Sequence, residues 1–148
     1  MIPKEKRVKQ SFDMLVLLDD LVNKTKQIMN GSYESDEKTG KKVDYFGKRD
    51  LWMRESIGRE LFAVSEFISA ANDLKPKTYG DYEIRRKNQQ MALSHLSKLR
   101  DAVKLAAFFI SRISKNSVNE WVGRKIALEK CLEGWISSDY ERYHNLLR

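Results

Sequence analysis

The stretch DYEIRRKNQQMALSHLSKLRDAVKLAAFFISR, residues 81–112, decides the fold. It contains neither proline nor glycine and is rich in Leu, Ala, Lys, Arg and Gln, which favour helix. With successive residues placed 100° apart, its apolar side chains gather within roughly 140° of the circumference. The stretch therefore predicts one long amphipathic helix. Its predicted apolar face consists of Ile84, Met91, Ala92, His95, Leu96, Leu99, Ala102, Val103, Ala106, Phe109 and Ile110.

Three further amphipathic helices are predicted around this one, because apolar residues recur there every three or four positions. Pro76 and Gly80 interrupt the chain before residue 81. Ser117 and Glu120 have the spacing of a capping box at the start of the last helix, and Ser114 is an alternative cap one turn earlier. The predicted ranges are about 4–30, 48–73 and 117–136. The first helix has the apolar stripe Val8, Phe12, Leu15, Leu18, Val22, Thr25 and Met29.

The remaining segments are a predicted loop and a predicted tail. Residues 31–47 are polar and rich in turn-forming residues, which indicates a long loop. Residues 137–148 form a tail, in which Ser138 and Glu141 have the spacing of a cap for a short extra helix. Four amphipathic helices with one long and two short connections predict an all-α fold, an antiparallel up-down four-helix bundle.

Length and composition favour a single domain over residues 1–148. The chain is 41% hydrophobic and 33% charged, and it has no apolar run near the ~18 residues of a membrane span. Its first residues, MIPKEKRVKQ, lack the apolar stretch of a secretory signal. We therefore expect a cytoplasmic protein that makes no membrane contact.

The net charge of +7 is concentrated in one part of the chain, since residues 81–130 hold eleven Lys and Arg against five Asp and Glu. Most of this charge falls opposite the apolar face of the 81–112 helix, along nearly 40 Å at about 1.5 Å per residue. Tyr79 and Tyr82 stand beside its first arginines and offer rings for stacking. This pattern is typical of a nucleic-acid-binding face, and a solvated helix face is an equally weighted alternative. The candidate binding residues are Arg85, Arg86, Lys87, Lys98, Arg100, Lys104 and Arg112.

Aromatic residues beside the core stripes predict a subunit interface, because monomers rarely expose broad apolar patches. The alternative is that these rings wrap the edges of their own bundle. The candidate interface residues are Trp52, Phe62, Phe67 and Trp121.

Catalytic and metal-binding motifs are not evident. The sequence has no Gly-rich phosphate loop, no nucleophile elbow and no paired His on one helix face, so we expect no enzyme activity, no cofactor and no metal. His95 lies on the apolar side of its helix, where a histidine with one hydrogen bond is the favoured interpretation. His144 has no evident partner in the tail, and a site formed by it with Asp and Glu is the least favoured alternative. Cys131 is interpreted as a small core or edge residue.

Two segments carry a family resemblance. RRKNQQMALSHLSKLRDAVKLAAFFISRIS, with the later LEKCLEGWISSD, resembles the accessory variability determinant (Avd) proteins of diversity-generating retroelements. FGKRDLWMRESIGRELFAVSEFISAAN is similar to the second helix of that family. The pattern is shared in part with the four-helix proteins of ribosomal intervening sequences. It departs from the family at Gly47, where proline is common, and at Glu133, where glycine is common. The matching positions are Phe46, Lys48, Arg49, Gly58, Ala71, Arg85, Arg86, Gln89, Ala92, Ile113, Ser114, Gly134 and Trp135.

This resemblance implies a four-helix bundle that assembles into a barrel-like homopentamer with a positively charged exterior and channel. It also implies an accessory protein without catalytic activity, which binds the retroelement's reverse transcriptase and its template-repeat RNA during mutagenic retrohoming. Carried over by position, Arg85, Arg86, Lys98, Lys104 and Arg112 face RNA or the polymerase. The alternative is an interaction protein of the intervening-sequence kind, whose role is unknown.

Overall fold

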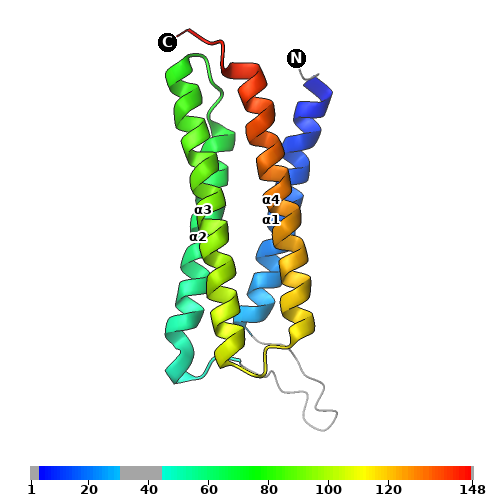
Figure 1. The fold of residues 1–148 in the computed structure, drawn as a ribbon, viewed down its shortest axis with the longest axis vertical. Helices are drawn as coiled ribbons and strands as arrows, with labels where there is room; N and C mark the ends of the chain where they lie inside the picture. Colours follow the sequence, from blue (N-terminus) through cyan, green and yellow to red (C-terminus); the bar gives the residue numbers. More distant parts are fainter. Residues whose placement is uncertain (1–3, 31–44, 148) are drawn as a thin grey trace.

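A computed structural model describes residues 4–30 and 45–147 of the chain and confirms the predicted all-α class over that range (Figure 1). Four long helices make up nearly all of it, and no strand occurs among these residues. A short 3-10 turn, η1, precedes α2. The elements are α1 (Lys4–Asn30), η1 (Lys48–Asp50), α2 (Leu51–Asp73), α3 (Tyr79–Phe109) and α4 (Lys115–Tyr143).

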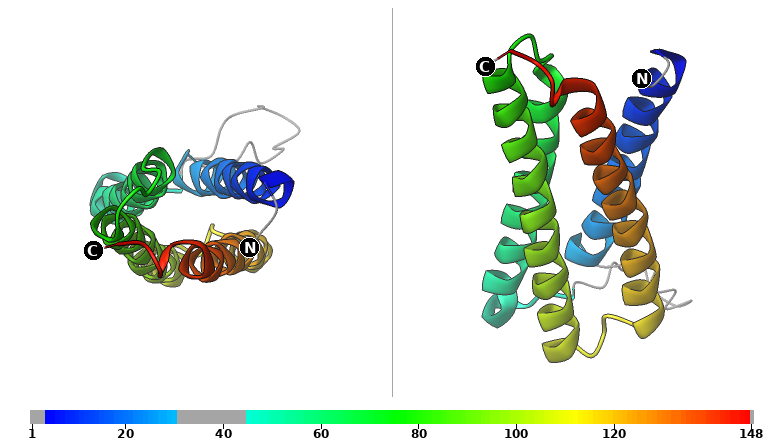
Figure 2. Two further views of the ribbon diagram at one scale, coloured as in Figure 1. Left: turned by 90° about the horizontal axis from the view of Figure 1, so that it is seen from above. Right: turned by 45° about the horizontal axis from the view of Figure 1, so that its top comes forward.

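The helices lie side by side as a bundle built from two pairs. Seen from above, α2 and α3 form one pair and α1 and α4 form the other (Figure 2). Smaller contacts between α3 and α4 and between α1 and α2 join the pairs. The first turn of α1 and the last turn of α4 lie at the same end of the bundle (Figure 1). Across the described ranges, none of the helices has the sustained apolar length that a bilayer span requires.

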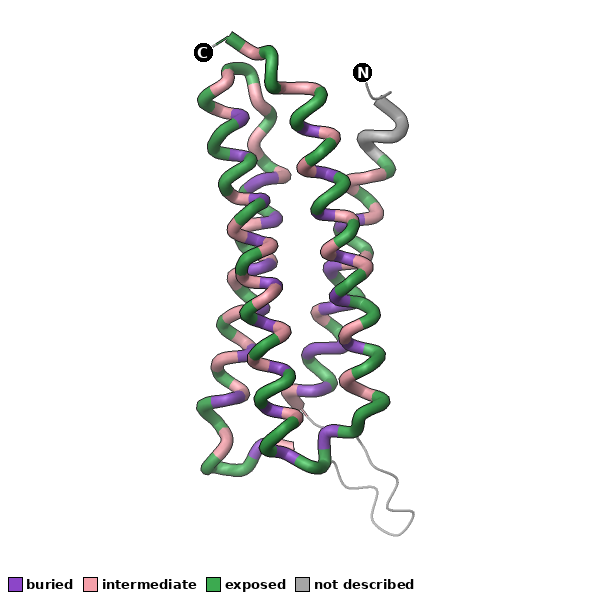
Figure 3. The backbone as a smooth tube through the Cα atoms, in the orientation of Figure 1, coloured by how far each residue is buried: buried purple, intermediate pink, exposed green. Residues whose placement is uncertain are grey.

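Buried side chains recur every three or four residues on one side of each helix (Figure 3). This spacing keeps them on one face, so the four faces meet in a common core. The largest fully buried side chains are Met14, Leu21, Ile28, Ile57, Ile68, Tyr82, Leu96, Leu99, Trp121, Leu128, Leu132 and Trp135.

Helix α3 begins two residues before the predicted start because Thr78 caps it. Thr78 Oγ1 accepts a hydrogen bond from the Asp81 backbone N–H at 3.1 Å, and the Asp81 carboxylate accepts one from the Thr78 N–H at 3.3 Å. This capping box satisfies two donors that would otherwise be unpaired. The helix ends at Phe109, so the predicted end at residue 112 is wrong and Arg112 lies in the following turn.

Helix α4 is longer than predicted at both ends. Ser114, the alternative cap, accepts a hydrogen bond from the Ser117 backbone N–H at 3.1 Å, so the helix begins at Lys115. It continues to Tyr143, which corrects the predicted tail over residues 137–148. The helix continues past the predicted end because its inward face stays buried there, and Asp139 on that face has no exposed surface. The predicted loop, apart from residues 45–47, lies outside the described residues.

The apolar stripe of α1 differs from the predicted one. Met14, Leu21 and Ile28 are buried, whereas Phe12 and Leu15 are exposed. Leu18 and Thr25 of the predicted stripe are buried, and Val22 and Met29 pack partly buried against the core, so the prediction holds in part. The side chain of Val8 lies outside the described residues. On α3 the predicted core residues Ile84 and Phe109 are likewise exposed.

A buried hydrogen bond ties α4 to α1. Trp121 is completely buried, which corrects its predicted place at a subunit interface. Its Nε1–H donates to Thr25 Oγ1 at 2.8 Å, and that hydroxyl donates to the Leu21 carbonyl at 2.6 Å. Nearby, Lys24 donates to the Glu120 carboxylate at 2.7 Å, and this hydrogen bond holds the pKa of Glu120 below its usual value. The two helices are thus joined by polar as well as apolar contacts.

Replacing Thr25 with Val is expected to lower the free energy of unfolding by about 1–3 kcal/mol, because it leaves the buried indole N–H of Trp121 without an acceptor. Urea unfolding measures the loss. The matched control is Val16→Thr, an exchange of the same two residue types at an exposed position of α1, expected to stay within about 0.5 kcal/mol of wild type. An unchanged midpoint for Thr25→Val would contradict the assigned role of this hydrogen bond.

Candidate nucleic-acid interface

Most of the predicted cationic residues of α3 point outward. Arg86, Lys87, Lys98 and Lys104 are exposed on the helix, and Arg112 is exposed in the turn that follows it. Arg100 is partly exposed, and its guanidinium lies 3.2 Å from the carboxylate of Asp101. The prediction that these side chains are accessible therefore agrees with the structure.

The cationic residues form two groups, whereas the sequence indicated one continuous strip. Arg86 and Lys87 lie near the start of α3, and no Lys or Arg occurs again until Lys98. The axial gap from Lys87 to Lys98 is about 16 Å at about 1.5 Å per residue. The later group is joined by Lys115, the exposed first residue of α4, which the sequence analysis missed. We call Lys98, Lys104, Arg112 and Lys115 the distal basic group.

Two shallow pockets border the distal basic group. Lys104 and Lys115 line a mostly apolar pocket of about 330 Å³ between α3 and α4. Lys98 lines another of about 250 Å³ between α2 and α3, together with Trp52. Lys104 and Lys98 thus line pockets on opposite sides of α3. The charged surface therefore extends across the helix as well as along it.

Arg85 is not part of this surface, which corrects its predicted role in binding. It is 6% exposed, and its guanidinium makes two hydrogen bonds to the Asp139 carboxylate, Nε–Oδ2 at 2.5 Å and Nη2–Oδ1 at 3.1 Å. Nη1 donates to the Leu74 carbonyl at 3.0 Å, and the guanidinium carbon lies 4.8 Å from the ring centroid of Trp135. Arg85 therefore links α3, α4 and the end of α2 from within the bundle.

Asp139 is the centre of this polar cluster and was not singled out by the sequence analysis. Gln89 Nε2 donates to it at 2.7 Å, and Arg142 Nη2 donates at 2.5 Å. One carboxylate thus faces two guanidinium groups. We call Arg85, Gln89, Asp139 and Arg142 the buried polar cluster. Its contacts are structural, because Arg85 and Asp139 have almost no accessible surface.

The two histidines have ordinary structural partners. His95 Nδ1 lies 2.6 Å from the Glu60 carboxylate, and its ring stacks on Phe67 at a centroid distance of 5.4 Å. This agrees with the predicted single hydrogen bond. His144, expected to lack a partner, is the residue that caps the end of α4, with Nδ1 2.5 Å from the Tyr140 carbonyl oxygen and its ring stacked on Tyr140.

The thiol of Cys131 is partly buried. Burial raises the pKa of the Cys131 thiol, which keeps it protonated and unreactive at neutral pH. In residues 4–30 and 45–147, no group of three or more His, Cys, Asp or Glu side chains converges to hold a metal ion.

The predicted interface aromatics divide into exposed and packed residues. Trp52 and Phe62 are 54% and 69% exposed on α2. Phe67 is half-buried against the core, and Trp121 is inside it. Other exposed apolar residues were not predicted to be exposed. Some of them belong to the stripes that were assigned to the core, and the others were not assigned to any surface. These exposed residues include Phe12, Leu15 and Val16 on α1 and Leu105, Phe108 and Phe109 on α3.

Comparison of the chain with protein-family models, with curated proteins and with solved structures gave no match. The fold and the site are therefore interpreted from the residues themselves, and the resemblance to accessory variability determinant proteins stays a prediction.

Proposed function

We propose that this protein is a non-enzymatic accessory protein that binds nucleic acid. In the form that the family resemblance favours, it binds the reverse transcriptase and template-repeat RNA of a diversity-generating retroelement and supports mutagenic cDNA synthesis and retrohoming in the cytoplasm. The observation that supports nucleic-acid binding is the exposed charge of the distal basic group, which no ion pair with a described residue neutralises.

The charge of that group is available to a ligand. Lys98, Lys104, Arg112 and Lys115 are exposed, and none of them forms an ion pair with another residue of the described ranges. Lysine and arginine side chains of this kind neutralise phosphates and release the counterions that surround them. Nothing in the group resembles a reader of base edges, so the contact is mainly electrostatic and sensitive to salt.

The proposal includes an assembly. In it, the chain is an antiparallel up-down bundle, and several copies form a homo-oligomeric barrel, which the resemblance predicts to be a pentamer. The exposed rings of Trp52 and Phe62 support an interface between copies, because burying an aromatic side chain is favourable. Head-to-tail contacts that close produce a ring, which is the geometry of a barrel.

Size-exclusion chromatography with light scattering tests this proposal, with and without a structured RNA, at about 0.1 M and 0.5 M salt. We expect a particle roughly five times the chain mass of 17.4 kDa. It should shift to larger size with RNA at low salt and release the RNA at high salt. A particle with the mass of one chain that does not bind RNA at either salt concentration would refute both the nucleic-acid binding and the assembly.

The exposed aromatic residues also favour a second candidate, an interaction protein of the ribosomal intervening-sequence kind. Phe62 and Phe108 are 69% and 82% exposed. An oligomer that does not respond to RNA would support this candidate over the first. A reverse-transcriptase gene and a pair of near-identical repeats beside the coding sequence would favour the retroelement function.

A further inference from the structure

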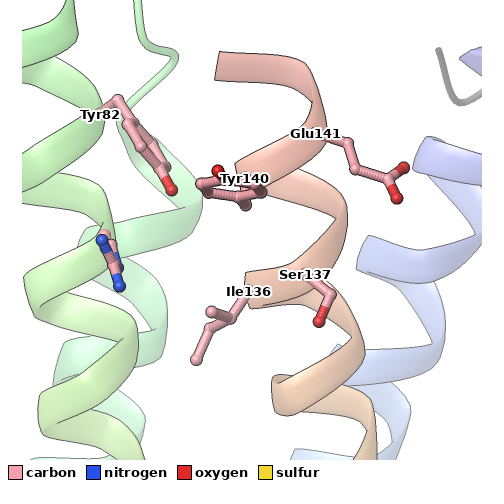
Figure 4. Close-up of a pocket in the computed structure, with 6 residues that line it drawn as sticks. Tyr82, Ile136, Ser137, Tyr140 and Glu141 are labelled. Carbon is pink, nitrogen blue, oxygen red and sulfur yellow. The ribbon is translucent and has the colours of Figure 1, made fainter. Parts of the chain in front are cut away.

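A second ligand-sized feature lies at the other end of α3 from the distal basic group. It is a pocket of about 370 Å³ between the beginning of α3 and the last turns of α4 (Figure 4). This volume falls in the range of small-molecule sites, roughly 300–1,000 Å³. The pocket is lined by Tyr82, Arg86, Ile136, Ser137, Tyr140 and Glu141.

The most unusual group in the pocket is the hydroxyl of Tyr82. The residue is 2% exposed, and its Oη has no hydrogen-bond partner among the described residues. Burial raises the pKa of Tyr82, with Asp139 adding to the rise and Arg86 opposing it, so the group is a neutral hydroxyl at pH 7. A buried hydroxyl without a partner is costly, and a ligand oxygen or nitrogen beside it would remove that cost.

The other lining groups form a polar and aromatic set. Tyr140 is 53% exposed and lies across the pocket from Tyr82, and one face of its ring stacks on His144 at a centroid distance of 4.5 Å (Figure 4). Arg86 is exposed and has no ion-pair partner in the described part of the chain. The Glu141 side chain points away from Tyr82 and Tyr140, toward α1 (Figure 4). The polar and aromatic groups of the pocket are thus a stacking ring, a guanidinium and tyrosine hydroxyls.

We propose that this pocket binds one nucleotide unit. Its base stacks on Tyr140 and its phosphate meets Arg86. The Tyr82 hydroxyl hydrogen-bonds a polar edge of the base once the side chains that cover Oη move aside, which the present burial of Oη requires. The unit is either a free nucleotide or an unpaired nucleotide of an RNA, and only the second form rests on the proposed function.

The pocket and the distal basic group are separate sites. Arg86 and Lys104 stand about 27 Å apart along α3 at about 1.5 Å per residue. Variants at one end therefore leave the other intact, which makes the two proposals independently testable.

Saturation-transfer NMR with AMP as the probe tests the pocket, with adenosine and ribose 5-phosphate as partial ligands. We expect AMP to bind with a Kd of about 0.1–1 mM. Adenosine and ribose 5-phosphate are each expected to bind more weakly, because each lacks one of the two recognised groups. Equal binding of AMP and adenosine would overturn the role of Arg86, and no AMP signal at millimolar concentration would overturn a free-nucleotide site.

Three variants locate the binding. Tyr140→Ala should weaken AMP binding about 5- to 100-fold through lost stacking, and Arg86→Ala about 10- to 100-fold through lost phosphate contacts. Their matched controls are Phe12→Ala and Lys130→Ala, which remove an exposed aromatic and an exposed cationic side chain elsewhere and should leave AMP binding unchanged.

Tyr82→Phe separates a ligand contact from a structural role. It should weaken AMP binding about 2- to 10-fold and leave the urea midpoint unchanged or raise it, since it removes a buried hydroxyl that has no partner in the described protein. A lowered midpoint with unchanged AMP binding would overturn the assignment.

A short single-stranded RNA distinguishes the two sources of the nucleotide. If the RNA and AMP compete, and Tyr140→Ala weakens both, the pocket accepts an RNA nucleotide. If AMP binds, and RNA neither binds the protein nor competes with AMP, the pocket is a free-nucleotide site. In that case the proposed nucleic-acid function is refuted and the pocket proposal stands. If RNA binds through the distal basic group and AMP does not bind or compete, the pocket proposal fails alone.

Discussion

Asp139→Asn is expected to lower the free energy of unfolding by about 3–5 kcal/mol, the cost of removing one partner of a buried ion pair. The side chain of Asp139 is completely buried and accepts hydrogen bonds from Arg85, Gln89 and Arg142. Removing its charge leaves the Arg85 guanidinium, 6% exposed, without a counterion inside the bundle. Because small domains have a total stability of about 5–15 kcal/mol, this variant approaches the limit of folding.

Urea unfolding followed by circular dichroism measures this change. Asp101→Asn is the matched control, since Asp101 is an exposed acidic residue paired with Arg100, and its removal should cost about 0–1 kcal/mol. If the Asp139 variant does not fold, Asn can be introduced together with Arg85→Met, which removes the stranded charge as well. That double variant should be more stable than Asp139→Asn. If both single variants fold, a double-mutant cycle should give a coupling energy of about 0.5–3 kcal/mol. Equal midpoints for wild type and Asp139→Asn would contradict the central role of this carboxylate.

The buried polar cluster shows how far the sequence could have led. The inward face of α3 follows a regular three-four spacing through Tyr82, Arg85, Gln89, Ala92 and Leu96. Periodicity alone therefore places Arg85 and Gln89 inside. Arg85 was nevertheless assigned to the surface, because core positions were chosen by hydrophobicity. A charged residue at a core position of a helical repeat is itself a signal that a buried partner exists.

The partner of Arg85 was harder to find. Asp139 continues the inward spacing of Leu128, Leu132 and Trp135 on α4, but the polar sequence around it indicated a tail. Its burial depends on the pairing of α4 with α3, which no local pattern specifies. Strong local signals, such as the length of α3 and the Ser114 cap, were recoverable from the sequence. The exact orientation of the buried face of α1, with Met14 inside and Phe12 outside, was not, because only the neighbouring helices determine it.

Charge reversal in the distal basic group is expected to cause the largest loss of nucleic-acid binding. In the triple variant Lys98→Glu, Lys104→Glu and Arg112→Glu, RNA affinity at about 0.1 M salt should fall about 10²- to 10³-fold, because three phosphate contacts are lost. The slope of log affinity against log salt should become shallower by about 2–3. Arg85 is left out of this variant, because a glutamate there would disrupt the buried polar cluster and abolish binding through unfolding.

A control of equal charge makes this experiment decisive. Lys9→Glu, Lys26→Glu and Lys130→Glu change exposed residues on α1 and α4. Each replacement changes the charge by two, so both triple variants go from a net charge of +7 to +1. If the distal variant loses affinity and the control keeps most of it, the distal basic group is the RNA-binding surface. Equal losses would show that net charge alone attracts RNA, and a larger loss in the control would place the contact on α1 and α4. Circular dichroism of both variants should match wild type, since the replaced side chains are exposed and make no ion pair within the described ranges.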